Sequence, residues 1–175
     1  MRMFIGVELD NETKNQIADA MKYIEAFAES RIMTDKSNLH LTLLFLGEVE
    51  PCDVDKIEIC IKSLKTKLKA SVFEAFSFGT FKNDRITYLA VNDDGLLQSL
   101  HNMLIGELQN AGFNVYDSAF NPHITLARNT RYNNTDELLK TVLHKIRINC
   151  NNVTLFHSYR DGKLIYKPIY KEALN

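Results

Sequence analysis

The sequence predicts an α+β fold with two lobes, in which two antiparallel sheets flank a central cleft and helices lie outside. Two observations carry this prediction. Strand-like apolar runs outnumber the amphipathic helical segments and are mixed with them along the chain. Two similar stretches, "NLHLTLLFLGEV" and "NPHITLAR", place their histidines 83 positions apart (residue 123 minus residue 40), about half of the chain. We therefore expect residues 1–175 to form a single domain made of two pseudo-symmetric lobes.

Composition limits the classes of protein to consider. The chain is 45% hydrophobic and 25% charged, which is typical of a globular domain, and its formal net charge of −1 argues against bulk binding to a nucleic-acid backbone. The three cysteines are an odd number without C-x-x-C spacing, which favours reduced thiols. The first apolar run is broken by Glu8 and Asp10, so we expect no membrane span and a cytoplasmic protein.

The first half of the chain alternates strands and helices. A strand is expected over 3–9, followed by an amphipathic helix over 10–30 with Asp10 or Asn11 as its N-cap. The stretch at 38–47 predicts a second strand. A second helix is expected over 51–70, with a proline in its first turn.

The second half continues the mixed order. Strands are expected at 71–81 and 85–92, joined by the turn "KND", and a helix over 94–111 should end at Gly112. A strand at 121–128 then leads through a polar loop and a short helix to a closing pair, 145–160 and 163–172, joined by the turn "DG".

The two related strands carry unusual side chains for apolar runs. Successive side chains in a strand point to opposite faces, so His40 shares a face with Thr42, and His123 shares one with Thr125. One such histidine would ordinarily be a hydrogen-bonded structural residue. A pair in nearly the same "H-(L/I)-T-L" context favours a shared function.

Two imidazoles and two hydroxyls supply what cleavage of a phosphodiester without a metal needs. One histidine can take a proton from water while the other protonates the leaving alkoxide, because the ordinary histidine pKa of about 6.5 allows both states near neutral pH. In-line displacement puts the two oxygens on opposite sides of phosphorus, which suits one histidine from each lobe. Zinc is the other common use of paired histidines, but neither motif has the further ligands clustered beside it.

These residues resemble a known family. "MRMFIGVEL", "NLHLTLLFLGEV", "NPHITLAR" and "VTLFHSYRDGKLIYKPI" occur in order over nearly the whole chain and are similar to the 2H phosphoesterases, specifically the RNA 2′,3′-cyclic phosphodiesterases, also called 2′-5′ RNA ligases. The resemblance implies hydrolysis of 2′,3′-cyclic phosphates on RNA or nucleotides to a 2′-phosphomonoester. It implies no cofactor and no metal. We expect a monomer whose partner is RNA with such ends.

The resemblance also implies roles for individual residues. His40 would protonate the O3′ leaving group and His123 would assist the attacking water. Thr42 and Thr125 would hold phosphate oxygens, and Arg128 would add a charged contact. In a regular strand Arg128 would point away from the histidine face, so this role requires a bend or bulge after Ala127; otherwise it is a surface arginine.

Other residues are weaker candidates. Tyr88 occupies a position where many relatives carry tryptophan, and it either stacks on a base or packs in the core. Arg131 and Tyr132, in the predicted loop "RNTRYNN", either line an RNA-binding wall or belong to an ordinary polar loop. The role of His157 stays open. His101 and His144 are expected to be structural or solvated.

Two alternatives use the same cleft. The first is cleavage of a 2′,5′-phosphodiester or its reversal as 2′-5′ RNA ligation, which the same pair of histidines could catalyse. The second is a module that binds RNA ends or nucleotides without turnover.

Overall fold

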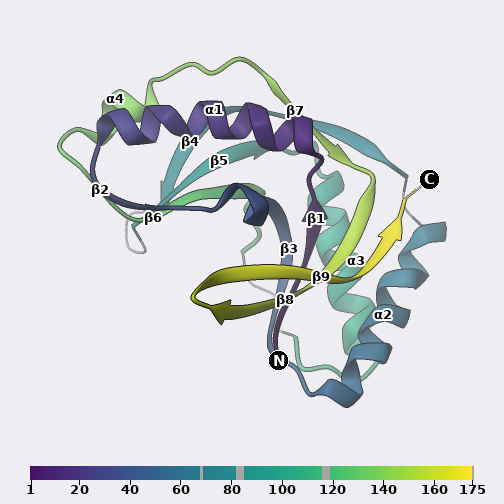
Figure 1. Ribbon diagram of the computed structural model, residues 1–175. Coiled ribbons are helices and arrows are strands. Elements are labelled where there is room, and N and C mark those ends of the chain that lie inside the picture. Colours follow the sequence, from purple (N-terminus) through teal and green to yellow (C-terminus); the bar gives the residue numbers. More distant parts are fainter. Residues whose placement is uncertain (68, 82–84, 116–118, 175) are drawn as a thin grey trace.

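Figure 1 shows the computed structural model of the chain, which describes residues 1–67, 69–81, 85–115 and 119–174. Its strands are β1 (Arg2–Glu8), β2 (Ala28–Met33), β3 (His40–Glu48), β4 (Ser71–Phe81), β5 (Ile86–Asn92), β6 (His123–Tyr132), β7 (Ile146–Cys150), β8 (Asn152–Asp161) and β9 (Lys163–Ala173). Its α-helices are α1 (Asn11–Phe27), α2 (Val54–Ser63), α3 (Leu96–Asn110) and α4 (Thr135–Leu139). No helix of the described residues is long and apolar enough to cross a membrane.

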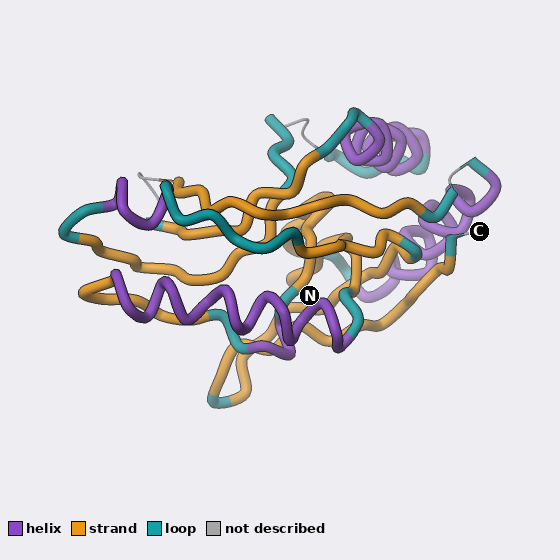
Figure 2. The backbone as a smooth tube through the Cα atoms, turned by 90° about the horizontal axis from the view of Figure 1, so that it is seen from above, coloured by secondary structure: helices purple, strands orange, loops and turns teal. Residues whose placement is uncertain are grey.

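The strands form two antiparallel sheets. One has the order β3-β1-β8-β9 and the other the order β2-β6-β5-β4-β7. Helices α2 and α3 pack on the first sheet, and α1 and α4 pack on the second, so the helices lie outside (Figures 1 and 2). Strand β3 of the first sheet contacts β6 of the second. The predicted α+β fold with two antiparallel sheets is confirmed, and each sheet carries one histidine motif.

Helix α1 follows its sequence signals at the start but ends early. The Asp10 carboxylate accepts a hydrogen bond from the Thr13 amide at 2.7 Å, which identifies Asp10 as the N-cap. The helix buries Ile17, Met21 and Ile24 at the spacing of one helical face. The predicted helix to residue 30 is wrong, because Ala28 is already extended and begins β2. Strand β2 is mostly exposed, so it has no apolar alternation in the sequence.

Three expectations in the second half need comment. The turn "KND" lies at 82–84, outside the described residues. The predicted single strand over 145–160 is wrong: the chain breaks after Cys150, and β7 and β8 belong to different sheets. The buried Asn152 holds this break, because its side chain accepts from the Glu8 amide and donates to the Glu8 carbonyl, both at 2.9 Å. The closing pair β8–β9 with its "DG" turn is confirmed, and Gly162 has the positive φ of 67° that this turn requires.

The close contact of β1 with β3 allows a test of the fold. A Cβ added at Gly6 would lie 2.6 Å from the Leu41 carbonyl oxygen, which is main chain and cannot turn away. Gly6→Ala is therefore expected to lower the free energy of unfolding by about 1–3 kcal/mol. Gly106→Ala is the matched control, since a Cβ there meets nothing within 4 Å and should stabilise α3 by about 0.5–1 kcal/mol. Urea unfolding measures both, and equal stability of the two variants would contradict the prediction.

A candidate active site between the two sheets

The two motifs place their polar side chains on one face of each sheet. His40 and Thr42 point to the same side of β3, because the His40 Nε2 lies 2.9 Å from the Thr42 Oγ1. The residues between the motif pairs, Leu41 and Ile124, are fully buried on the opposite faces. Strand alternation therefore puts all four motif side chains on the surfaces that face the other sheet.

Both histidines are held in the same way. The His40 Nδ1 donates to the Asn38 carbonyl, and the His123 Nδ1 donates to the Asn121 carbonyl, each at 2.6 Å. A carbonyl oxygen can only accept, so in the neutral ring the proton sits on Nδ1 and the lone pair on Nε2. Each neutral histidine therefore presents a basic Nε2, and each protonated one presents an Nε2–H donor.

Aromatic rings surround each imidazole. The His40 ring centroid lies 4.7 Å from that of Phe4 and 5.0 Å from that of Tyr166. Burial lowers the pKa of His40 to about 4, and the positive charge of Arg128 adds to the effect, while the hydrogen bond to Asn38 opposes it. The pKa of His123 is also lowered, chiefly by burial. Both rings are therefore neutral at neutral pH while no anion occupies the site.

Arg128 reaches this site through a bulge in β6. Tyr88 pairs with Thr125, while the preceding residue Thr87 pairs with Ala127, so Leu126 is an extra residue in β6. The bulge reverses the alternation, and Arg128 lines the same cavity as His40 and Thr125. The expected irregularity is present, but it precedes Ala127 instead of following it.

Tyr88 lies beside the second histidine. Its ring centroid is 5.2 Å from that of His123 and 4.4 Å from that of Phe81. Its neighbours Thr87 and Leu89 are fully buried on the other face of β5. A partly exposed Tyr88 ring on the histidine face is available for stacking, which favours the first of the two interpretations of this residue.

The predicted loop "RNTRYNN" is wrong, because β6 continues to Tyr132. The Tyr132 hydroxyl is hydrogen-bonded to the Thr87 hydroxyl at 2.7 Å, on the core side of the sheet, and burial raises the pKa of Tyr132. Arg131 is exposed opposite Ser30 of β2 and does not line the cavity that contains Arg128. These two residues do not form a wall of the site.

The remaining histidines lie outside the predicted chemistry. His157 is on the opposite face of β8 from Phe156, whose ring faces His40, and it packs against Tyr159. His101 is buried in α3, and its Nδ1 donates to the Leu43 carbonyl of β3 at 2.7 Å. His144 is exposed.

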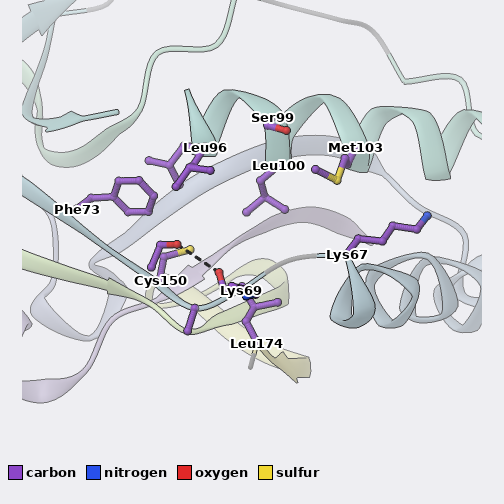
Figure 3. A pocket seen from close by; sticks show the side chains of 12 residues that line it. Lys67, Lys69, Phe73, Leu96, Ser99, Leu100, Met103, Cys150 and Leu174 are labelled. Carbon is purple, nitrogen blue, oxygen red and sulfur yellow. Dashed lines mark hydrogen bonds between the residues drawn. The ribbon is translucent and has the colours of Figure 1, made fainter. Parts of the chain in front are cut away.

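Cavities distinguish this site from other hollows of the surface. The cavity that contains His40, Thr125 and Arg128 measures about 590 Å³. A smaller one of about 110 Å³ is lined by Thr42 and His123. A third, of about 530 Å³, lies between α3, β4 and the C-terminal residues (Figure 3), and its lining includes none of the predicted site residues. The described residues contain no group of three or more histidine, cysteine or acidic side chains that could hold a metal ion.

The sequence reasoning missed several residues of the site. The Asn38 amide nitrogen donates to the Leu164 carbonyl at 2.8 Å, and its oxygen accepts from the Tyr166 amide at 3.0 Å, which ties the start of β3 to β9. The asparagine two residues before each histidine was a visible signal for this support. Arg160 and Lys163, near the tip of the β8–β9 hairpin, also line the large cavity, and their spacing contains no signal that would identify them.

Known proteins share this sequence and this fold. An RNA 2′,3′-cyclic phosphodiesterase of Thermotoga maritima is 30% identical over 131 residues, covering 73% of this chain and 70% of the relative. One of Archaeoglobus fulgidus is 29% identical, covering 76% of this chain and 75% of the relative. The crystal structure of E. coli LigT in its apo form aligns with a TM-score of 0.84 at 24% identity, covering 99% of this chain and 96% of that one, which supports the fold.

The family assignment rests on the sequence. The model of the 2′-5′ RNA ligase superfamily matches residues 10–162, a range that includes both histidine motifs. This match and the Thermotoga maritima relative establish that the chain belongs to the 2′-5′ RNA ligase superfamily.

Proposed function

We propose that this protein hydrolyses 2′,3′-cyclic phosphates at RNA ends or on nucleotides to 2′-phosphomonoesters without a metal ion. One observation carries the proposal: each sheet contributes a histidine whose Nδ1 donates to a main-chain carbonyl, which leaves Nε2 for proton transfer. Relatives named RNA 2′,3′-cyclic phosphodiesterase support the substrate class.

The reaction needs two proton transfers. The His123 Nε2 takes a proton from water as the water oxygen attacks phosphorus. The bond between phosphorus and O3′ breaks, and the His40 Nε2–H protonates the departing oxygen. The hydroxyls of Thr42 and Thr125 and the guanidinium of Arg128 donate to the non-bridging oxygens. His40 becomes protonated only when the phosphate anion is bound, because its pKa in the empty site is about 4.

Hydrolysis in excess EDTA tests this function. The purified protein is incubated with a nucleoside 2′,3′-cyclic phosphate, and the 2′- and 3′-monophosphates are separated. The 2′-monophosphate is the expected product. The 3′-monophosphate would contradict the proposed leaving oxygen but keep the hydrolase, and activity that depends on added metal would contradict the histidine mechanism.

A second candidate function is cleavage or formation of 2′,5′-phosphodiesters, which the name of the superfamily favours. The same two histidines serve both directions, because the reverse of a reaction passes through the same transition state. Parallel assays of a 2′,3′-cyclic end and a 2′,5′-linked dinucleotide distinguish these reactions. Tight binding of both without product would instead favour a non-catalytic binder.

We further propose that residues 1–175 form one domain of two related lobes that acts as a monomer in the cytoplasm. One histidine motif on each sheet supports the related lobes. The free state of Cys52, Cys60 and Cys150 supports a reducing compartment. Size-exclusion chromatography with light scattering tests the monomer.

A further inference from the structure

The large cavity extends beyond the histidines. At one end are His40 and Thr125, and at the other are Arg160 and Lys163 of the β8–β9 hairpin. This hairpin projects from the four-stranded sheet (Figure 1). The volume of about 590 Å³ lies within the range of about 300–1,000 Å³ that is typical of ligand pockets, and it exceeds the needs of one phosphate group.

The charges in this cavity are not balanced. Asp35 is the acidic residue in its lining, and it is paired with Lys163 at 2.8 Å. This pair holds the hairpin against the segment before β3 and lowers the pKa of Asp35. Among the described residues, no ion pair involves Arg128 or Arg160. Two arginines from different sheets therefore face the cavity without acidic partners, which favours an anionic ligand.

The cavity also offers contacts for a sugar or a base. Ile32 of β2 is 60% exposed, and Leu164 and Tyr166 of β9 are partly exposed in the same lining. Guanidinium groups beside an apolar surface and an aromatic ring fit a nucleotide better than they fit an isolated inorganic anion.

We propose that Arg160 binds the phosphate on the 5′ side of the terminal nucleotide, so that the cavity selects RNA ends over mononucleotides. This inference rests on the proposed function, which places the terminal cyclic phosphate between the two histidines. The chain of the RNA then leaves the site past Arg128 toward the β8–β9 hairpin. Arg160 determines the substrate class and takes no part in the bond cleavage.

Three substrates test the inference: a nucleoside 2′,3′-cyclic phosphate, the same compound with a 5′-phosphate, and a dinucleotide that ends in the cyclic phosphate. The unmodified protein is expected to show a kcat/KM about 10-fold or more higher for the second and third, as one charge-assisted contact would provide. In Arg160→Ala this preference should fall to near one while kcat for the first substrate is unchanged. The slope of log KM against log salt for the dinucleotide should fall by about 0.7.

Lys167→Ala is the matched control, because Lys167 is an exposed cation of the same hairpin that pairs opposite His157, on the other face. It should keep the preference, and Arg160→Lys should keep part of it. Equal kcat/KM for all three substrates, or an unchanged preference in Arg160→Ala, would overturn the inference and leave the proposed function in place. A failure to hydrolyse any of the three would overturn both.

Discussion

Replacing His40 or His123 with alanine is expected to lower kcat for cyclic phosphate hydrolysis by about 10²- to 10⁴-fold in each case. Each imidazole moves one proton in the transition state, and the described neighbours offer no second base on either strand. Single-turnover measurements on a nucleoside 2′,3′-cyclic phosphate give the effect directly, because they exclude product release from the observed rate.

His157→Ala is the matched control for these variants. His157 is also a histidine of a sheet strand, but it lies on the face of β8 away from His40. It should retain nearly full activity. Thermal unfolding of each purified variant checks that a loss of rate is not a loss of fold, and full activity in folded His40→Ala or His123→Ala would refute the site.

A sulfur in place of O3′ separates the two histidine roles. A thiolate leaves without protonation, so this substrate should restore much of the rate of His40→Ala and little of the rate of His123→Ala. The opposite pattern would exchange the acid and the base. That exchange is a real alternative, since burial lowers the pKa of both rings.

The parts of the fold that the sequence predicts are those whose signal is local. Asp10 caps α1 through a hydrogen bond to a residue three positions away, and Gly162 forms a turn through its own φ. The shared face of His40 and Thr42 follows from the period of a strand. Each of these depends on neighbours in the sequence, so one chain suffices to find it.

The parts that were missed depend on distant residues. Strand β2 has no apolar alternation and is held by pairing with β6, about a hundred positions away. The break at Asn152 depends on the main chain of Glu8. The extra residue Leu126 is visible only from the register of β5 against β6. Tertiary pairing decides all three.

The same division applies to the site. The histidines and threonines could be found because the motif occurs twice. The rings of Phe4 and Tyr166, which remove water from His40, come from β1 and β9 and carry no motif. The lowered pKa of His40 is therefore a property of the folded chain alone.

That property predicts how stability depends on pH. Unfolded histidine has a pKa of about 6.5, whereas His40 in the folded chain has a pKa of about 4. Between these values the unfolded state binds more protons, so stability rises with pH through this window. The contribution of His40 is complete above about pH 6.5, is lost progressively as the pH falls toward 4, and is absent below it. Its size is roughly 3 kcal/mol, at 1.36 kcal/mol for each pKa unit.

His40→Gln removes this titration and leaves His123 in place. The difference in unfolding free energy between the unmodified protein and His40→Gln, measured in urea from pH 7.5 to pH 4, should therefore shrink as the pH falls. Inorganic phosphate should weaken the trend, because an anion beside the ring favours its protonated form. A constant difference across the window would mean that His40 keeps an ordinary pKa and that Phe4 and Tyr166 do not exclude water from it. His40 would then be ready to donate a proton before any substrate arrived.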